Sequence, residues 1–379
     1  MRLNEAMRCL VIGMIFLLVS CSQDSAQPVA QSPASPSPSV SPIATPSATT
    51  SDLPLKTVDF SCRLPVVRSS YLGSGPFNFS GGFITFPAGT FAVDPAGGVS
   101  ISPQGGLVVT DASPKLYNGP LQFGGPFYDR AEKRWLPASA SQVSSDGAFY
   151  AYGSFDPQHG DPGRIHIVNV STATEKVFAA SAPNVDQGFT VAEFSSAGIY
   201  LVATQVQRAP AGAWLMNPVT GEIRPLAQVA GVLAIRNGFA WIRRVDPRDP
   251  SPPVTGKGTP SDSVVQVDLA TGAETIWFYR PGLLVELQGF DSGSLPVVTV
   301  FDPSASKISF ESRLIDGPGS PGSVVYAGQQ TLSEVLGDGN RLWLSGSTGI
   351  YLYTADRGLQ KVFGSNPANE GTTPVGACL

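Results

Sequence analysis

A short unit of turn and strand recurs along most of the chain, and this repetition constrains the fold more than any other feature. In Ser144–Tyr152, for example, a turn at Ser145-Asp146-Gly147 leads into a run of alternating apolar and polar residues. Asp-Gly supplies the positive-φ position that a tight turn needs, and alternation gives the following strand one buried face. The turn glycines of successive units are Gly105, Gly147, Gly198, Gly238, Gly293 and Gly339.

A second turn recurs downstream of the first. In one unit it reads Asp268-Leu269-Ala270-Thr271-Gly272. Comparable turns occur at Asp129–Glu132, Ser171–Thr174, Asn217–Gly221 and Thr354–Gly358. The turn glycines lie 40 to 55 residues apart. A unit of this length with four short strands is typical of radially repeated β-sheets.

Two of these motifs resemble a known fold family. S-P-x-G before a strand, followed later by V-D-L-A-T-G-A-E, resembles the blades of WD-repeat-like and related bacterial β-propellers. The Trp-Asp dipeptide of the strict WD repeat is absent. The resemblance covers most of Leu55–Leu379 and implies an all-β propeller built from blades of four antiparallel strands. It implies no particular activity.

The ends of the repeat region suggest how a ring would close. Six complete units run approximately over Gly98–Phe363. Three strand candidates precede them without an innermost strand, at Phe60–Val67, Gly82–Phe86 and Thr90–Asp94. Pro374–Leu379 follows the last unit and could supply the missing strand. We therefore expect seven blades and a ring closed between N- and C-terminal strands, with six blades plus an N-terminal addition as the alternative.

The N-terminus resembles a bacterial lipoprotein signal. Arg2 and Arg8 form a basic region before an apolar run, Cys9–Val19, that is too short to span a bilayer. The run ends in Leu18-Val19-Ser20-Cys21, which resembles a lipobox. The resemblance implies that residues 1–20 are removed and that the Cys21 thiol carries a diacylglycerol. An ordinary secretory signal with a chance cysteine is the alternative.

A proline-rich segment follows the expected lipid site. Ser22–Pro54 contains seven prolines among Ser, Ala and Thr, and such a composition cannot form a core. We expect residues 21–54 to be a disordered tether with a reach of at most roughly 100 Å, and residues 55–379 to be the propeller domain. The arrangement predicts an extracytoplasmic protein, lipid-anchored to the cell membrane or the outer membrane.

The two remaining cysteines, Cys62 and Cys378, lie near the ends of the expected domain. In an oxidising compartment an even remainder of two predicts a disulfide. Two buried free thiols are the alternative. A zinc site needs four ligands, so these two cysteines alone do not indicate one.

Charge and motif content exclude several functions. The net charge is −5 and no Lys/Arg cluster occurs, so we expect no nucleic-acid partner. No phosphate-binding, dinucleotide or nucleophile motif is present, and with two histidines we expect no candidate for a Ser-His-Asp triad.

His166 is expected to be structural. His159 lies between Asp156 and Asp161, but turn formation explains that loop better than a cation site. We expect no cofactor, no metal and a monomer.

One face of the expected propeller carries loops of variable length. Antiparallel strands place the second-to-third loops and the links between blades on the same face, and binding function usually lies on such loops. Candidate ligand-binding residues there are Arg208, Arg248, Arg280, Trp277 and Tyr279. Arginine with aromatic residues suits carboxylate-bearing glycans or peptides. Local pairing of the arginines with nearby aspartates is the alternative.

Carboxylates suggest a second class of function. Glu193, Glu286 and Glu334 precede their turn glycines and are expected on or near inner strands. Two carboxylates facing across a channel would allow glycoside cleavage, whereas a solvated channel lining is the favoured explanation. We therefore expect a binding or scaffold module for a protein, peptide or glycan of the cell envelope. An extracytoplasmic hydrolase or lyase that uses channel carboxylates is the alternative.

Tryptophans recur on or beside the expected strands, as Trp214, Trp241, Trp277 and Trp343. We interpret them first as packing between blades, because large aromatic side chains contribute most of the apolar area that such interfaces bury.

The lipobox generates a direct test. We expect mass spectrometry of the membrane-extracted protein to show an acylated cysteine at position 21 as the mature N-terminus. Each buried methylene of an acyl chain contributes about 0.8 kcal/mol to membrane binding, so two or three chains anchor the protein stably. An unmodified N-terminus at Ser22 or later would contradict this prediction.

Overall fold

The computed structural model describes residues 53–70, 78–101, 107–109, 114–117, 126–155, 163–180, 188–203, 212–245, 261–365 and 370–379. All described residues belong to the compact unit Ala48–Leu379. The predicted lipid site Cys21 and most of the predicted tether lie outside the described residues. Within the described ranges, no helix has the length and apolar character needed to cross a membrane.

Nearly all regular structure in the described residues is β-strand. The first sheet contains, in spatial order, β27 (Glu370–Pro374), β1 (Cys62–Ser70), β2 (Asn78–Phe86), β3 (Thr90–Ile101), β4 (Leu107–Val109) and β5 (Leu116–Tyr117). A hairpin follows, β6 (Phe127–Asp129) with β7 (Arg134–Leu136), and then the 3-10 helix η1 (Ala140–Gln142). The next sheet contains β8 (Phe149–Ser154), β9 (Arg164–Asn169) and β10 (Glu175–Ala179).

Four antiparallel meanders of four strands make up the rest. The first two are β11 (Phe189–Ser195), β12 (Gly198–Ala203), β13 (Ala213–Met216) and β14 (Ile223–Pro225), then β15 (Val232–Arg236), β16 (Phe239–Arg244), β17 (Ser263–Asp268) and β18 (Glu274–Tyr279). The last two are β19 (Leu284–Phe290), β20 (Pro296–Phe301), β21 (Phe310–Leu314) and β22 (Ser323–Gly328), then β23 (Leu332–Asp338), β24 (Arg341–Gly346), β25 (Gly349–Thr354) and β26 (Gly358–Gly364). A short parallel pairing of β19 with β23 joins these last two.

The predicted turn glycine Gly105 lies outside the described residues, and four of the other five have positive φ angles. Gly147 and Gly238 have φ angles of 75° and 81°, a region that L side chains rarely adopt. At the predicted Gly293 turn the left-handed residue is instead Ser294, with φ of 68°. Four of the five downstream turns share one device, in which a side-chain oxygen accepts the backbone N–H groups two and three residues later. The residues that do so are Asp129, Asn169, Asn217 and Asp268.

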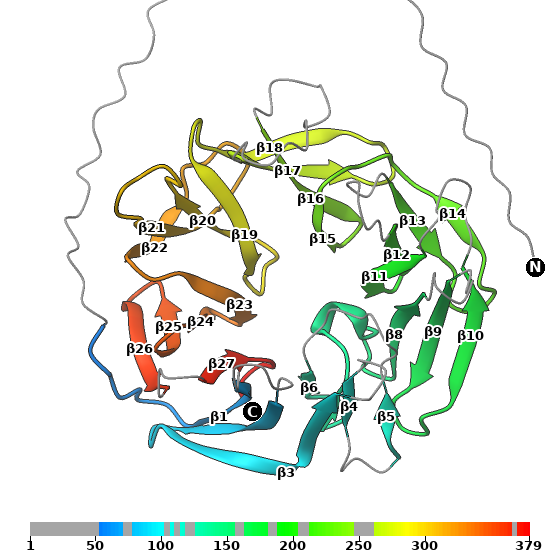
Figure 1. Ribbon diagram of the computed structural model, residues 1–379, viewed down its shortest axis with the longest axis horizontal. Coiled ribbons are helices and arrows are strands. Elements are labelled where there is room, and N and C mark those ends of the chain that lie inside the picture. Colours follow the sequence, from blue (N-terminus) through cyan, green and yellow to red (C-terminus); the bar gives the residue numbers. More distant parts are fainter. Residues whose placement is uncertain are drawn as a thin grey trace, which may run out of the picture. The chain divides into compact units, whose positions relative to one another are not determined.

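Apolar clusters connect each sheet to the next. One contains Ile167 of β9 and Leu201 of β12, and the next contains Tyr200 of β12 and Ile242 of β16. Further clusters continue the series, through Trp241 with Val298 and through Leu344 with Val297. In Figure 1 the sheets succeed one another around a central opening, with β11, β15, β19, β23 and β27 beside it. Four-stranded antiparallel sheets packed in this way form a β-propeller, which confirms that the domain is an all-β propeller.

Tryptophan burial follows the same pattern. Trp241 and Trp343 are 2% and 0% exposed, and Trp214 is 8% exposed. Trp343 packs against Leu64 and Ile84 in a cluster that joins β24 to β1 and β2. The interpretation of these residues as packing between sheets is confirmed.

The two ends of the domain are joined by strand pairing and by a disulfide. β27 pairs antiparallel with β1, in a register from Val66 opposite Pro374 to Ser70 opposite Glu370. Beyond the strand, Leu379 and Arg63 exchange two backbone hydrogen bonds. Cys62 and Cys378 form the predicted disulfide, with Cα atoms 5.5 Å apart. That distance is ordinary for neighbouring strands, so the bond and the pairing are compatible.

One region departs from the predicted pattern. The sequence indicates a strand ending at Asp94 and a new unit at Gly98, but β3 continues from Thr90 to Ile101. The physical reason is Trp135, whose indole N–H donates to Asp94 and whose ring lies on the backbone of the nearby glycines. A Cβ at Gly97 would be 2.7 Å from the indole nitrogen. The β2–β3 ladder skips from Val93 opposite Gly82 to Gly98 opposite Ser80, so the strand continues past this bulge.

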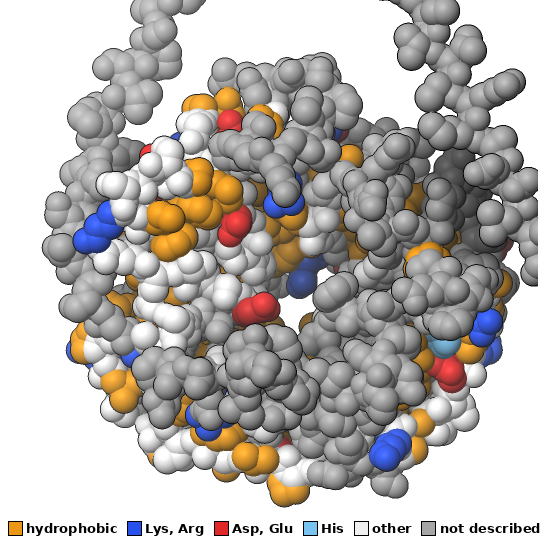
Figure 2. Space-filling view, in the orientation of Figure 1, with side chains coloured by type: hydrophobic (Ala, Val, Ile, Leu, Met, Phe, Trp, Pro, Cys, Tyr) orange, Lys and Arg blue, Asp and Glu red, His pale blue; other side chains and the backbone are white. Residues whose placement is uncertain are grey.

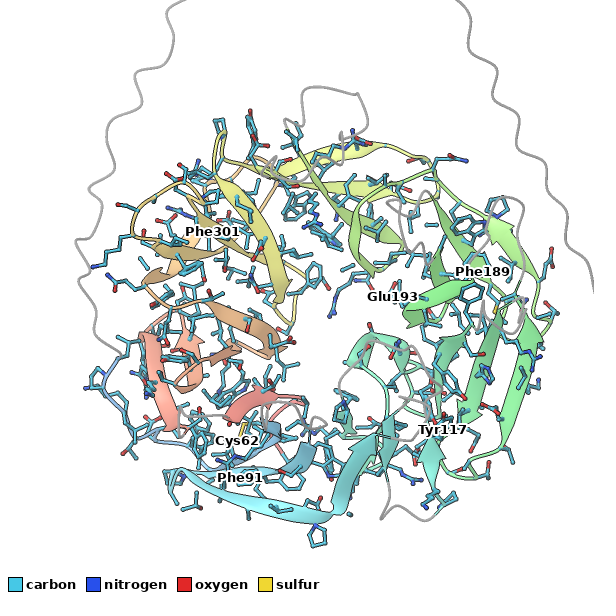
Figure 3. The ribbon with its side chains drawn as sticks, in the orientation of Figure 1. Cys62, Phe91, Tyr117, Phe189, Glu193 and Phe301 are labelled. Carbon is cyan, nitrogen blue, oxygen red and sulfur yellow. A yellow bond between two sulfur atoms is a disulfide. The ribbon has the colours of Figure 1, made fainter. Side chains whose placement is uncertain are left out.

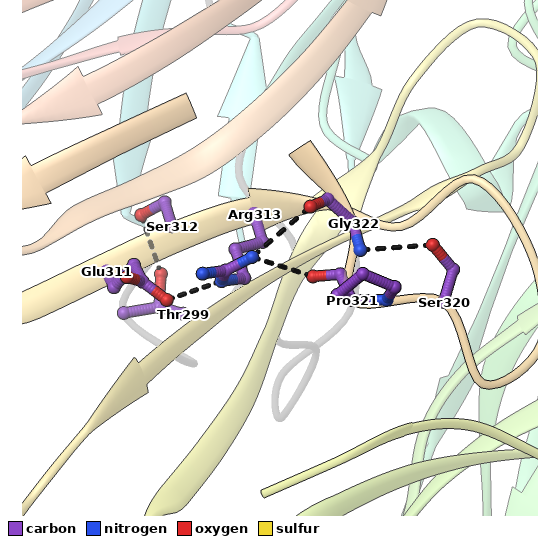
Figure 4. Close-up of polar contacts among 7 residues, drawn as sticks. All are labelled: Thr299, Glu311, Ser312, Arg313, Ser320, Pro321 and Gly322. Atoms are coloured by element: carbon purple, nitrogen blue, oxygen red, sulfur yellow. Dashed lines mark hydrogen bonds and ion pairs between the residues drawn. The ribbon is translucent and has the colours of Figure 1, made fainter. Parts of the chain in front are cut away.

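The unit around Asp316–Gly322, which the sequence indicates is the least regular, is held by a different device (Figure 4). Arg313 pairs with Glu311 and donates to the carbonyl oxygens of Pro321 and Gly322. A guanidinium thus replaces the Asx side chain that orders the corresponding turn in other units.

The disulfide closes a loop with a sequence separation of 316 residues. Because a cross-link over so long a loop restricts the unfolded chain, we expect Cys62→Ser with Cys378→Ser to lower the free energy of unfolding by up to about 5 kcal/mol. Chemical denaturation of the two proteins would measure the difference. Equal midpoints for variant and wild type under non-reducing conditions would contradict this expectation.

Candidate functional site

The strands beside the central opening share an irregularity. β11, β15, β19 and β23 are each the first strand of a meander, and each has a register shift against its neighbour. The shifts fall between Val191 and Glu193, Val232 and Ala234, Leu287 and Gly289, and Ser333 and Leu336. Such bulges bend a strand and redirect a side chain, and they are frequent next to binding sites. They occur here where the predicted glutamates Glu193, Glu286 and Glu334 lie.

Glu193 connects neighbouring sheets. It lies beside the central opening (Figure 3), and its Oε1 accepts the backbone N–H of Asn237 at 3.0 Å. Its Oε2 is buried and has no hydrogen-bond partner among the described residues. Burial raises the pKa of the Glu193 carboxyl, while the Asn237 N–H and the charge of Arg236 oppose that shift. Glu193 therefore ties β11 to the turn between β15 and β16.

Similar ties continue from turn to turn. Arg236 donates to the Ser294 hydroxyl at 3.1 Å, and its guanidinium lies 5.3 Å from the centre of the Phe290 ring. Asn237 donates to the same hydroxyl. The Ser292 hydroxyl in turn donates to the carbonyl of Gly339 in the next turn. These hydrogen bonds hold successive sheets together, so the groups that form them serve a structural role.

Glu286 and Glu334 differ in their surroundings. Glu286 is half-buried and accepts a hydrogen bond from Gln288 on its own strand. Glu334 is exposed and has a φ of 51°, which a residue with a side chain rarely adopts. Such strain persists only where the surroundings enforce it, and it concentrates at functional sites. Of the three glutamates, Glu334 has the local geometry expected of a binding residue.

A cavity of about 340 Å³ contains Glu334, and we call it the central pocket. Its walls come from β1, β6, η1, β23 and β27 or from residues next to them. The apolar lining consists of Val67, Pro126, Phe127, Ala140, Val335, Leu336, Pro374 and Val375. The polar lining consists of Glu334, Ser139 and Thr373. Figure 2 shows acidic and basic side chains beside the central opening on the viewed face.

The pocket offers one carboxylate. Neither Glu193 nor Glu286 lines it, so these three glutamates do not supply a facing carboxylate pair to one cavity. Within the described ranges, no three Asp, Glu, His or Cys side chains come together as a metal site. His159, Asp156 and Asp161 lie outside those ranges. The arrangement suits binding of a ligand with hydrogen-bond donors and an apolar face.

The predicted loop-face residues are only partly described. Arg208 and Arg248 lie outside the described residues. The Arg280 guanidinium is 5.1 Å from the centre of the Phe278 ring, and its backbone N–H donates to Asp262. Trp277 occupies a bulge in β18, donates to Gln266 at 3.1 Å and packs edge-on against Trp241. Tyr279 is half-buried at the end of β18. Trp277 is thus engaged in packing, and the binding role of the set stays a prediction.

A polar chain that the sequence did not reveal lies on β8, β9 and β10. Ser154 Oγ is 2.7 Å from His166 Nε2, and His166 Nδ1 is 2.9 Å from Glu175 Oε1. The sequence predicts no candidate for a Ser-His-Asp triad, and the carboxylate that the strands bring to His166 is a glutamate. Sequence reasoning missed this contact because Ser154, His166 and Glu175 lie on three different strands and belong to no local motif. Only the register of the strands brings them together.

The raised pKa of Glu193 predicts a pH dependence. The folded state holds this proton more tightly than the unfolded chain does, so the wild type loses stability as pH rises from the ordinary value of 4.5 through the raised value. Glu193→Gln does not titrate. We expect its free energy of unfolding, relative to wild type, to increase between pH 4 and pH 7. The exposed Glu132→Gln is the matched control, and an equal slope for both variants would contradict the assignment.

Comparisons with known proteins give similarity of fold only. No protein-family description matches the sequence, and no curated protein matches it significantly. A prolyl endopeptidase structure matches with a TM-score of 0.48 and 12% identity over 80% of this chain, which spans about half, 51%, of that protein. TolB from Acinetobacter baumannii matches at 0.36 and 11%, over 83% of this chain and 65% of TolB. A putative 6-phosphogluconolactonase from Bacteroides uniformis matches with a TM-score of 0.40 and 11% identity, over 82% of this chain and 99% of that protein.

Proposed function

We propose that this protein is a lipid-anchored, extracytoplasmic β-propeller that binds a peptide or glycan of the cell envelope in its central pocket. The lipobox-like sequence at Cys21 and the proline-rich segment 21–54 support anchoring and reach. We expect the protein to act as a monomer. We expect neither a cofactor nor a nucleic-acid partner for this role.

The proposed architecture has seven blades and a ring closed by β27. The count is supported by seven apolar clusters among the described residues, each of which joins neighbouring sheets. Closure is supported by the β1–β27 pairing and by the cluster of Trp343 with Leu64. The alternative is six blades with an N-terminal addition.

Glu334 is the observation that carries the binding proposal. An exposed carboxylate at a strained bulge would accept hydrogen bonds from amino or hydroxyl groups, and charge-assisted hydrogen bonds are stronger than neutral ones. The hydroxyls of Ser139 and Thr373 offer further polar contacts. Phe127 and Pro126 offer an apolar wall on which a sugar ring or a peptide side chain can pack. A cavity of about 340 Å³ accommodates a small group of this kind.

The test uses the full chain in detergent against chito-oligosaccharides and against an array of short peptides with free amino termini. For a probe that binds, we expect Glu334→Gln to weaken binding about tenfold, because it removes a charge-assisted hydrogen bond worth about 1.5–3 kcal/mol. Glu132→Gln, a change of equal chemistry at an exposed turn, should leave the affinity unchanged.

A third variant separates the central pocket from the loop face. If Arg280→Ala weakens the probe and Glu334→Gln does not, the ligand binds at the loop face and the central-pocket assignment is wrong. If neither class of probe binds the wild type at millimolar concentration, the proposed ligand classes are wrong.

A further inference from the structure

Three side chains on the β8–β9–β10 sheet form a hydrogen-bonded chain from a hydroxyl to a carboxylate. Ser154 Oγ lies 2.7 Å from Nε2 of His166, and Nδ1 of His166 lies 2.9 Å from Oε1 of Glu175. No part of the central pocket contributes to it. The order of the groups, nucleophile to imidazole to carboxylate, is the order that general-base activation requires.

Strand register explains how the chain assembles. His166 lies opposite Tyr152 in the β8–β9 ladder, and Glu175 lies opposite Val168 in the β9–β10 ladder. Residues two apart on a strand share a face, so Ser154 and Glu175 are the diagonal neighbours of His166 on that face. Diagonal neighbours are within reach of long side chains. Both contacts therefore follow from the pairing itself.

The hydrogen bonds determine which imidazole nitrogen carries the proton. An ionised Glu175 only accepts, so Nδ1 must donate to it. In the neutral ring Nε2 is then the acceptor, and the Ser154 hydroxyl must donate to Nε2. The serine proton thus already points at the base that would remove it.

Tyr152 holds the imidazole in place. Its ring stacks on His166 with 4.4 Å between centroids and 3° between planes, and its hydroxyl donates to Glu175 Oε1 at 2.6 Å. Burial and the neighbouring carboxylate raise the pKa of Tyr152, so the phenol remains a neutral donor. Two contacts to one carboxylate, plus the stack, restrict rotation of the His166 ring.

The chain is accessible to small molecules. The side chains of His166 and Glu175 are 14% and 37% exposed, and Ser154 is half-buried. Val177, which lies opposite His166, is 46% exposed and offers an apolar surface beside the imidazole. A short acyl chain could pack there, whereas the partly buried serine disfavours bulky acyl groups.

We propose that Ser154 is a nucleophile activated by His166, and that it accepts acyl groups from short-chain carboxylic esters. Ser154 Oγ attacks the ester carbonyl carbon while its proton passes to Nε2. The bond to the alkoxide then breaks, the alkoxide takes the proton from Nε2, and acyl-Ser154 remains. Water, deprotonated by Nε2, attacks this acyl group and releases the carboxylic acid and free Ser154. Glu175 and Tyr152 are positioning residues that orient and stabilise the imidazolium.

The experiment labels the full-length wild-type protein with an alkyl fluorophosphonate and maps the adduct by peptide mass spectrometry. We expect the adduct on Ser154 and none on Ser154→Ala. His166→Gln should label at least about 100-fold more slowly, the contribution typical of a general base. Ser144→Ala is the matched control, because Ser144 bonds Asp146 and no imidazole, and it should label at the wild-type rate.

Glu175→Gln distinguishes positioning from a purely structural role. We expect its maximal labelling rate to fall about tenfold while the half-saturating probe concentration stays unchanged. Thermal unfolding of each variant establishes that it is folded. The proposal is overturned if folded wild type is not labelled at Ser154, or if His166→Gln labels as fast as wild type. A p-nitrophenyl acetate burst equal to the protein concentration should accompany the labelling, and its absence would overturn the acyl-transfer step.

Discussion

The antiparallel pairing of β1 with β27 is the interaction on which the rest of the domain depends. It joins segments separated by some 300 residues, and the Cys62–Cys378 disulfide fixes the same neighbourhood covalently. Each sheet buries its faces against the next one, so an unpaired sheet at either end would expose an apolar face and a strand edge. Asp338 extends the join, since it accepts from the Cys378 backbone N–H and from the Trp343 indole. The central pocket depends on this join, because β27 forms one of its walls.

Local chemistry made the strands and turns predictable from sequence. A turn glycine such as Gly147 has a conformation that few other residues tolerate. The side-chain oxygen of Asp268 or Asn217 stabilises its turn by accepting a backbone N–H from two residues later. These signals act within a few residues, so they can be recognised without knowing the neighbouring sheets. The disulfide was predictable for a different reason, namely that only two cysteines remain within the domain.

The site could not be predicted to the same depth, because its features depend on contacts between distant segments. β3 continues past Asp94 because Trp135 packs against the backbone of Gly97 and donates a hydrogen bond to Asp94. The sequence near Asp94 does not identify Trp135 as its partner. A bulge on β23 directs Glu334, but alternation of residue types does not reveal where a ladder slips. The Ser154–His166 contact requires the β8–β9 register, which the turn at Ser145-Asp146-Gly147 before β8 does not determine.

The three glutamates of the inner strands show why position in a repeat does not assign a role. Glu193, Glu286 and Glu334 precede their turns in a similar way, yet each has different neighbours. The Asn237 backbone engages Glu193, and Gln288 engages Glu286. Each of those contacts lowers the carboxylate's capacity to accept a ligand's donor. Glu334 is exposed, on strained backbone beside an apolar wall. The unpartnered Oε2 of Glu193 is buried, whereas the Glu334 carboxylate is exposed and lines the pocket. Accessible hydrogen-bonding capacity is therefore the physical criterion that separates a binding carboxylate from a structural one.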